Sequence, residues 1–416
     1  MLQPNKMIKV LYIQAPPGGG SVIALCEMLK KIDPQVIEPL VLCYYKTPHT
    51  QLLEKASRGK INYLFPEYTT NLKTVSTFPS MSLLNKIWRI IENEYVAFKN
   101  YFFPQNNLLQ KITAAVRSFS PDIIHHNNDI SVDRVSIRAC NKFNIPQIVH
   151  NRSIAVYKQI SFNYFVDNYL HKKIAYNINI TEAVRNNYQK LFNTSPSHAG
   201  VLHDFVDEKK FSPTRPDTSL ISEFGLTKND FVVGDIGRII SWKGQHILIE
   251  ALNIIKTIVP NVKVLIVGPY DNGVGSEDYF THLKLLVKKY DLLNSVIFTG
   301  NRNDIPKIIN ICQIIAHTAI KPEPQGLIII EALLCKKTVI VADAGGAAEI
   351  ASKYGGILVT PGNQIELAAA IINCWEQHNK GGLSTKTDNA KLLNDFNGAA
   401  QIEKILSIYS SVIDNN

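Results

Sequence analysis

The alternation of short apolar runs with longer amphipathic stretches most constrains how this chain of 416 residues can fold. Each run of strand length is followed by a segment long enough for a helix, which predicts parallel sheets with crossover helices. The strands expected in the first half are Ile8–Gln14, Pro39–Tyr44, Ile61–Phe65, Ile123–His126, Gln147–His150 and Asn177–Ile180. Those expected in the second half are Phe231–Ile236, Lys263–Val267, Ser295–Phe298, Ile314–His317, Thr338–Ala342 and Gly356–Val359. The two sets predict two doubly wound sheets.

A polar, proline-bearing stretch separates the two sets of strands and is typical of a linker. We therefore predict an N-terminal Rossmann-like domain at 1–202, a linker at 203–217 and a C-terminal Rossmann-like domain at 218–395. The final stretch, 396–416, is expected to form a helix that packs on one of the two domains. The length of the chain agrees with two domains.

Composition indicates a globular protein, because 45% of the residues are hydrophobic and 19% are charged. A net charge of +9 suits nucleic acid, an anionic membrane surface or a polyphosphate-bearing substrate. Lysines and arginines are scattered, without zinc-finger spacing or an aromatic ribonucleoprotein signature, which argues against nucleic acid. Six dispersed cysteines, and no segment with the length of a signal peptide or membrane span, predict a cytoplasmic location.

Residues 83–103 combine leucine, isoleucine and many aromatic side chains with Lys86, Arg89 and Lys99. A basic, aromatic-rich helix of this kind can lie in a membrane interface or hold a lipid-linked substrate. The alternative is an ordinary helix that covers a core. Membrane contact, if this segment makes it, is expected to be peripheral.

A Pro/Gly turn flanked by two carboxylates, Glu323 and Glu331, opens into an apolar helix. Backbone N–H groups at Gly326 and Leu327 would then lie at a helix N-terminus, where the helix dipole favours a diphosphate. Glu331 could reach a ribose diol, and Glu323 could reach hydroxyls on the group that the phosphate carries. The alternative is a buried helix with one capping acid.

Two further strand-to-helix turns could bind the same kind of ligand. Glycines 18 and 19 follow the first strand and would let the backbone approach a phosphate or sugar, or simply make a tight turn. After a strand of the second half come Arg238 and Lys243, a planar fork and a point charge that suit a diphosphate, unless both are only solvated. A third turn, at Gly345-Gly346, suits close packing near phosphates.

Histidines follow two strands of the first half, as His125-His126 and as His150. Each could hydrogen-bond a sugar hydroxyl or move a proton, or could be a satisfied, partly buried ring. Neither metal-ligand spacing nor an Asp-x-Asp pair is present, so no metal is expected.

In order along the chain, these residues resemble the group 1 glycosyltransferases, the large family 4 of retaining enzymes with the GT-B fold. The resemblance rests on four motifs: Gly237-Arg238 with Trp242-Lys243-Gly244, Leu265-Ile-Val-Gly268, Glu323 with Glu331, and Gly345-Gly346 before Glu349. The segment His203-Asp204-Phe-Val-Asp207 departs from the family's common Asn-Gly-Val-Asp.

The resemblance implies two Rossmann-like domains that face each other across a cleft, with the donor bound mainly by the second and the acceptor by the first. The C-terminal helix would return to the N-terminal domain. At the donor, the resemblance implies Arg238 and Lys243 on the diphosphate and Glu331 on the ribose. It implies Glu323 and His150 on the transferred sugar, with help from the backbone at Gln325, Gly326 and Leu327. Gly18 and Gly19 would lie near the diphosphate and the acceptor.

The function implied is the transfer of a hexose-type sugar from a nucleoside-diphosphate sugar to a saccharide or lipid-linked acceptor in cell-envelope synthesis. No cofactor or metal is expected, and the location would be cytoplasmic or at the inner face of the cytoplasmic membrane. Two alternatives stay open: a nucleotide-sugar 2-epimerase on the same fold, and a sugar-nucleotide binding protein without catalysis.

Overall fold

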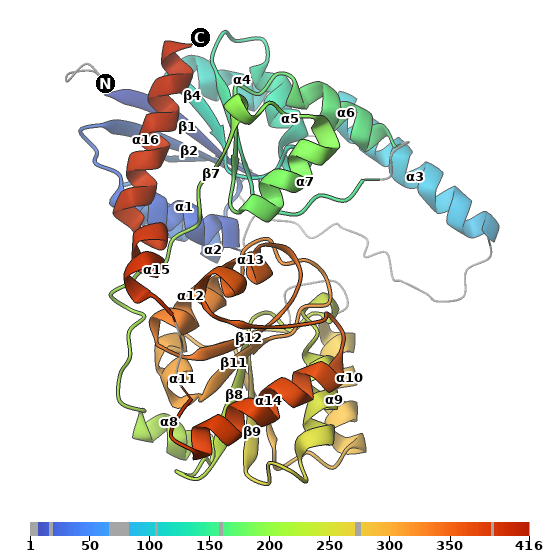
Figure 1. The fold of residues 1–416 in the computed structure, drawn as a ribbon. Coiled ribbons are helices and arrows are strands. Elements are labelled where there is room, and N and C mark those ends of the chain that lie inside the picture. Colours follow the sequence, from blue (N-terminus) through green and yellow to red (C-terminus); the bar gives the residue numbers. More distant parts are fainter. Residues whose placement is uncertain are drawn as a thin grey trace. The chain divides into compact units, whose positions relative to one another are not determined.

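The computed structural model describes residues 7–15, 20–65, 83–104, 107–157, 161–270, 276–383 and 387–415. The chain forms two compact units, which are described separately here (Figure 1). Unit 1 comprises Met1–Phe205 together with Gly398–Asn416, and unit 2 comprises Val206–Asn397. The chain thus leaves unit 1 after Phe205, inside the segment 203–217, and re-enters it at Gly398.

In the described residues, unit 1 contains a seven-stranded parallel sheet in the order β3-β2-β1-β4-β5-β6-β7. Its strands are β1 (Ile8–Gln14), β2 (Ile37–Tyr45), β3 (Ile61–Phe65), β4 (Ile123–His126), β5 (Gln147–Asn151), β6 (Tyr176–Asn179) and β7 (Ala199–Val201). The predicted strands of the first half are confirmed, with ends that shift by up to two residues. Strand β7 was not predicted from the sequence, because three residues are too short a run to show a period of two.

Helices cover both faces of this sheet (Figure 1). They are α1 (Gly20–Lys31), α2 (Pro48–Ala56), α3 (Leu83–Phe102), α4 (Leu108–Phe119), α5 (Ile130–Cys140), α6 (Phe162–His171), α7 (Glu182–Phe192) and α16 (Gly398–Asp414). The last helix lies beside α1 and buries Ile402, Ile405, Tyr409 and Val412 in the core of unit 1. Their spacing of three and four residues places them on one helical face, which explains why the end of the chain joins this unit.

In the described residues, unit 2 contains a six-stranded parallel sheet in the order β10-β9-β8-β11-β12-β13. Its strands are β8 (Phe231–Ile236), β9 (Val262–Val267), β10 (Val296–Gly300), β11 (Ile314–His317), β12 (Thr338–Ala342) and β13 (Ile357–Val359). The predicted strands of the second half are confirmed. Its helices are α8 (Thr218–Glu223), α9 (Gln245–Ile255), α10 (Ser276–Lys289), α11 (Ile305–Ile311), α12 (Leu327–Leu334), α13 (Gly345–Tyr354), α14 (Gln364–Asn379) and α15 (Asn389–Phe396).

The strand order of unit 2 reverses around β8, which pairs with β9 on one side and with β11 on the other. Connections from neighbouring strands diverge at such a point, and the carboxyl edge of an open sheet is where ligands bind. The loop after β8 carries Arg238 and Lys243, and the loop after β11 carries Glu323. The predicted fold class, two Rossmann-like doubly wound domains, is therefore confirmed, and topology brings the predicted donor loops to one edge.

Both central sheets are buried on two faces, so their strands are almost continuously apolar. Every residue of β12 is buried, and Val339, Ile340 and Val341 are at most 1% exposed. Each such side chain contributes roughly 1.5–3 kcal/mol of burial free energy. This rigid support holds the loops at the carboxyl edge.

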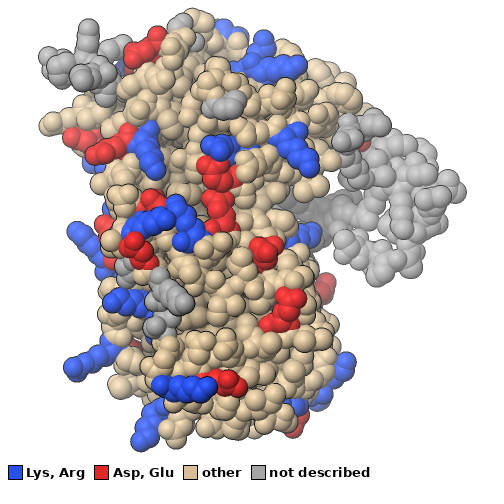
Figure 2. Space-filling view, viewed as in Figure 1, with Lys and Arg blue, Asp and Glu red and all other residues tan. Residues whose placement is uncertain are grey.

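Charged side chains are interspersed on the surface that Figure 2 displays, with lysine and arginine next to aspartate and glutamate. The scattered basic residues of the sequence thus form no single-sign field on this face. No helix in the described part of the chain is both long enough and apolar enough to cross a membrane.

Gly244 joins the loop after β8 to α9 and approaches the end of β11 closely. Its φ of +75° lies in the left-handed region, and a Cβ built on it would lie 2.1 Å from the carbonyl oxygen of Thr318. Only glycine satisfies both demands, because a methyl group would strain the backbone and would collide with a backbone atom. Gly244 therefore fixes how closely these two loops pack.

We expect Gly244→Ala to destabilise unit 2 much more than Gly362→Ala. Gly362 has nearly the same backbone, with a φ of +76°, but open space around its Cβ position. Gly362→Ala should lower the free energy of unfolding by about 1–2 kcal/mol, the cost of a left-handed alanine. Gly244→Ala should lower the free energy of unfolding, measured in urea, by several kcal/mol, because the backbone at Thr318 must also move. Equal losses would contradict the packing argument.

Candidate donor site

The site is built around the turn at Glu323, between β11 and α12. The backbone carbonyl of Glu323 accepts hydrogen bonds from the N–H groups of Gly346 (2.7 Å) and Ala347 (3.3 Å). These amides belong to the first turn of α13, so the predicted Gly345-Gly346 turn binds the Glu323 backbone. The turn after β11 and the helix after β12 are therefore tied together.

The carboxylate of Glu323 contacts two basic side chains. Lys243 Nζ lies 2.5 Å and His317 Nε2 lies 3.4 Å from Glu323 Oε2. All three side chains are at most 16% exposed, which limits screening by water. The structure thus brings together two residues that the sequence predicted, Glu323 and Lys243, and adds one that it did not, His317.

Burial alone would raise the pKa of Glu323. The hydrogen bond from His317 and the charges of Lys243 and His317 outweigh that effect and lower the pKa to about 2. The carboxylate is consequently ionised at neutral pH. A strongly stabilised carboxylate of this kind is a weak base, but it is a good acceptor for hydroxyl groups.

A second buried carboxylate, Asp235, lies beneath the Lys243 loop. The hydroxyl of Thr318 lies 3.1 Å from both Asp235 Oδ2 and the carbonyl oxygen of Lys243. Gln245 Nε2 lies 3.4 Å from Asp235 Oδ1 and donates to the carbonyl of Arg238 at 3.1 Å. Burial raises the pKa of Asp235 to about 6, against the charges of His317 and Lys243 and these hydrogen bonds.

Neither His317 nor Asp235 was singled out from the sequence. A signal for His317 was present, since it ends a predicted strand just as His150 does. Asp235 is an acid inside an otherwise apolar strand, which the sequence analysis did not consider.

Arg238 differs from Lys243 in that its side chain has no partner in the part of the chain that the structure describes. Its side chain is exposed, and its guanidinium makes no hydrogen bond or ion pair with any described residue. The backbone beneath it is fixed by Gln245. Because its backbone is fixed and its guanidinium has no partner among the described residues, Arg238 is suited to bind an anionic ligand.

Glu331 lies in the second turn of α12 and is partly buried. It forms no hydrogen bond or ion pair within the described residues, and burial raises its pKa to about 7. Two glutamates eight positions apart thus have opposite environments. Glu331 retains the capacity to accept hydrogen bonds from a ligand's hydroxyl groups.

The start of α12 has no side-chain cap. Gly326 occupies the N-cap position, Gln325 before it is 3% exposed, and Leu327 is the first helical residue. Because no side chain caps the helix, the first-turn amides keep their capacity for a ligand oxygen. The backbone positions predicted from the sequence, Gln325 to Leu327, therefore lie at the N-terminus of α12, on the connection that follows β11.

The remaining predicted site residues belong to unit 1. Gly18 and Gly19 lie outside the described residues. His150 lies on β5 and is 1% exposed. Its Nδ1 lies 3.2 Å from Nη2 of Arg152, and its Nε2 has no hydrogen-bond partner within the described residues.

His125 and His126, which end β4, are also buried. His125 Nδ1 lies 2.6 Å from the hydroxyl of Tyr409 on α16. His126 uses both ring nitrogens, with Gln147 at 2.8 Å and Ser136 at 3.2 Å, and burial lowers its pKa to about 4 although the Gln147 bond opposes this. His126 is therefore a satisfied structural ring.

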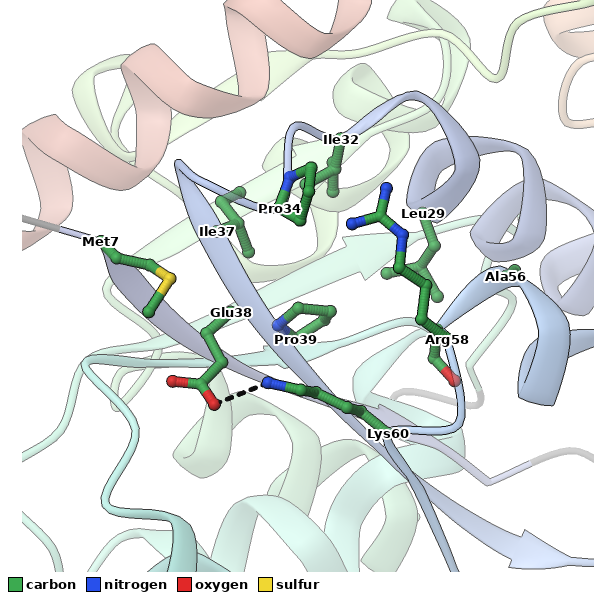
Figure 3. A pocket seen from close by; sticks show the side chains of 11 residues that line it. Met7, Leu29, Ile32, Pro34, Ile37, Glu38, Pro39, Ala56, Arg58 and Lys60 are labelled. Carbon is green, nitrogen blue, oxygen red and sulfur yellow. Dashed lines mark hydrogen bonds and ion pairs between the residues drawn. The ribbon is translucent and has the colours of Figure 1, made fainter.

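Figure 3 shows a hollow at the amino edge of the sheet of unit 1, where strands β2 and β3 begin. It is lined by Ile37 and Pro39 and by the ion pair of Glu38 with Lys60, 2.8 Å apart. Its cavity volume of about 80 Å³ is well below the roughly 300 Å³ of small-molecule pockets. The hollow is thus too small for a nucleotide sugar. Among the residues that the structure describes, no cluster of three potential metal ligands occurs.

Comparison with known proteins agrees with this geometry. Residues 217–386, nearly all of unit 2, match the family described as Glycosyl transferases group 1. The D-inositol 3-phosphate glycosyltransferase of Mycobacteroides abscessus is 27% identical over 54% of this chain and 48% of its own length. The chain thus spans about half the length of this curated relative.

Two solved structures resemble the whole chain. HepE of Anabaena (Alr3699), in complex with UDP and glucose, is 26% identical with a TM-score of 0.78, covering 97% of this chain and all of that one. A glycosyltransferase of Rickettsia africae shares the fold at 21% identity and a TM-score of 0.76, covering 99% of this chain and all of that one.

Unit 2 is therefore a group 1 glycosyltransferase domain, and the two Rossmann-like units give the chain the GT-B fold.

Glu331→Gln should stabilise the protein above pH 7 relative to acidic solution. In the unfolded chain Glu331 ionises near pH 4.5, whereas in the folded chain it ionises near pH 7. Folding therefore loses stability as the pH rises through this window, by on the order of 2–3 kcal/mol. Glutamine does not ionise, so the advantage of the variant in urea unfolding should grow by that amount between pH 4.5 and pH 8. A pH-independent difference would contradict the burial of an unpaired carboxyl.

Proposed function

We propose that this protein is a retaining glycosyltransferase that moves a hexose-type sugar from a nucleoside-diphosphate sugar to a saccharide or lipid-linked acceptor. Synthesis of cell-envelope polysaccharide or glycolipid is the proposed setting. The observation that carries the proposal is the arrangement at the carboxyl edge of unit 2. There, an unpaired Arg238, a Lys243–Glu323–His317 cluster and an unpaired Glu331 lie on connections from neighbouring strands.

Each group has a role that follows from its surroundings. Arg238 and Lys243 bind the diphosphate together with the amides at Gly326 and Leu327, Glu331 accepts from the ribose hydroxyls, and Glu323 accepts from hydroxyls of the transferred sugar. Gln325, Gly18, Gly19 and His150 complete the donor site in this proposal. Glu331 has no hydrogen-bond partner among the described residues. Binding of ribose hydroxyls to its carboxylate therefore breaks no existing hydrogen bond and costs little free energy.

Bond cleavage at the anomeric carbon builds positive charge on the sugar and negative charge on the leaving diphosphate. Fixed cations and helix-end amides stabilise that charge separation. Glu323 is a poor candidate for a nucleophile, because two basic groups already stabilise its carboxylate and its pKa is about 2. The leaving phosphate oxygen is therefore the proposed acceptor of the proton from the incoming hydroxyl, and the configuration is retained. No metal ion or cofactor takes part.

UDP-glucose is the donor to test first, because the similar HepE structure of Anabaena contains UDP and glucose. Binding of each nucleotide sugar raises the melting temperature if it favours the folded state. The same nucleotide sugars also test the two alternative functions, an epimerase and a binding protein without catalysis. Inversion at C2 in the absence of any acceptor would favour an epimerase, and binding without turnover in an acceptor screen would favour a sensor.

Lys243→Ala and Arg238→Ala should each reduce transfer by about 10²- to 10³-fold in turnover, because each removes a cation that stabilises the leaving diphosphate. Lys288→Ala is the matched control. It removes one positive charge from an exposed position in the last turn of α10 and should leave turnover unchanged. Product formation from radiolabelled donor measures all three variants. Full activity in both site variants would refute the proposed donor site.

The helix α3 supports a peripheral membrane contact or a lipid-linked acceptor, and the proposed location is cytoplasmic, at the inner face of the membrane. Tyr95 of α3 and Phe103, which directly follows this helix, are 63% and 70% exposed. The less exposed rings of Phe98 and Phe102 lie 4.7 Å apart, measured between their centroids. Exposed aromatic rings of this kind favour a bilayer interface.

We expect the double variant Tyr95→Ser, Phe103→Ser to bind anionic phosphatidylglycerol vesicles at least about tenfold more weakly than the unchanged protein, because it removes exposed apolar area. The matched control is Leu285→Ser, Leu293→Ser, which changes side chains of unit 2 that are 61% and 68% exposed. Co-sedimentation with vesicles measures binding. Equal weakening by both pairs, or no binding by the unchanged protein, would remove the membrane contact from the proposal.

A further inference from the structure

Arg152, two residues beyond His150, occupies the centre of a buried network at the carboxyl edge of unit 1. Its side chain is 8% exposed. Nε donates to the carbonyl of Asn127 at 3.1 Å, and Nη2 donates to Oδ1 of the same residue at 3.1 Å. Nη1 forms an ion pair with Asp204. Nη2 also lies 3.2 Å from Nδ1 of His150.

The last contact determines the tautomer of His150. A guanidinium can only donate hydrogen bonds, so Nδ1 of His150 must accept. In a neutral imidazole whose Nδ1 accepts, the proton is on Nε2. Nε2 forms no hydrogen bond of ordinary length and angle within the described residues, although the ring is 1% exposed. The Leu202 backbone, which raises the pKa of the ring, faces it as an acceptor. His150 is therefore held as a donor through Nε2, and the nitrogen that could take up a proton is already occupied.

The surroundings also keep the ring neutral. Burial, the charge of Arg152 and the proximity of His125 hold the pKa of His150 well below its usual range, and the Leu202 backbone opposes this only partly. The other titratable or charged groups around the ring are His125 on β4, whose ring centroid is 5.5 Å away, Tyr409 of α16 behind it, and Asp204 beyond Arg152. None of these places a carboxylate directly on the ring.

The backbone that carries Arg152 is fixed by Asp129. Its Oδ1 accepts from the N–H groups of Arg152 (2.8 Å) and Ser153 (3.2 Å), and its Oδ2 accepts from the hydroxyl of Ser153 (2.6 Å). Tyr188 donates to the same carboxylate at 3.0 Å. The backbone from which the guanidinium extends therefore cannot shift without breaking several buried hydrogen bonds.

Two other parts of the chain meet at Arg152. Asn127 donates to Gln14 Oε1 at 2.6 Å and to the carbonyl of Ser21 at 2.9 Å, which connects Arg152 to the end of β1 and the start of α1. Asp204 lies at the end of unit 1, one residue before Phe205, where the chain passes into unit 2. The backbone just before it is held as well, by Leu202 N–H donating to Asn179 at 2.9 Å.

We propose that Arg152 is a positioning residue, which holds His150 as a neutral Nε2–H donor for an oxygen of the bound sugar and anchors the start of the inter-unit connection through Asp204. The assignment rests on the proposed function for its ligand, a sugar hydroxyl. It excludes His150 as the base that deprotonates the acceptor. The tautomer itself does not depend on the ligand.

The first test measures the tautomer of His150 directly, without activity. The protein is labelled with ¹⁵N-histidine, and the His150 signals are identified by their loss in His150→Phe. The proton should be on Nε2, and the ring should stay neutral between pH 6 and pH 8. A proton on Nδ1, or protonation of the ring in that range, would overturn the proposal with the unchanged protein alone.

Variants of Arg152 then separate positioning from a merely structural role. Arg152→Met removes the donor to Nδ1, so both tautomers should appear and the pKa of His150 should rise. Turnover should fall by about 10²-fold with little change in KM for the donor. Arg152→Lys keeps a donor and should retain the Nε2 proton. Asp204→Asn leaves the contact between Arg152 and His150 in place and should also retain it.

The outcomes are distinguishable. If Arg152→Met does not fold, the spectra of the unchanged protein and of Arg152→Lys still decide the tautomer. If the tautomer is as stated and no nucleotide sugar is turned over, the proposed function fails while the positioning role stands. If Arg152→Met and Arg152→Lys have the same turnover and the same tautomer, Arg152 does not position His150.

Discussion

The turn at Glu323 is the constraint on which the rest of the site in unit 2 depends. Its backbone carbonyl holds the first amides of α13, and its carboxylate contacts Lys243 and His317. One residue thus joins the connections that follow β8, β11 and β12. A buried ion pair contributes little net stability of its own, because desolvation offsets the attraction. Its value here is geometric, since it fixes the position of a cation at the edge where an anionic ligand would bind.

The two glutamates of this site illustrate how environment assigns different roles to one side chain. Two basic groups keep Glu323 ionised, whereas burial without a partner raises the pKa of Glu331 to about 7. Carboxylates with separated pKa values are a recurring feature of functional sites. The histidines of unit 1 differ in a similar way. Both ring nitrogens of His126 have side-chain partners, whereas Nε2 of His150 has no side-chain partner among the described residues.

The sequence predicted the strands of both sheets well, because buried parallel strands are almost continuously apolar and stand out between helical segments. The family resemblance assigned Lys243 and Glu323 to one donor site but not to direct contact. The structure places them 2.5 Å apart, because they follow the neighbouring strands β8 and β11. It could not reveal His317 or Asp235 as members of the cluster, because their contacts depend on side-chain directions across the sheet. The tautomer of His150 could not be predicted from the sequence either. It follows from a guanidinium whose orientation is set by Asn127 and Asp204, which are distant from it in sequence.

The return of the last helix to unit 1 has a consequence for synthesis on the ribosome. Unit 2 is continuous in sequence, from Val206 to Asn397, whereas unit 1 lacks part of its core until α16 has emerged. The first half of the chain therefore stays incomplete while the second half is being translated and can already fold. Tyr409, which contacts both His125 and Tyr12, closes that core last. The core of unit 1 is thus completed by a helix that is translated after the whole of unit 2.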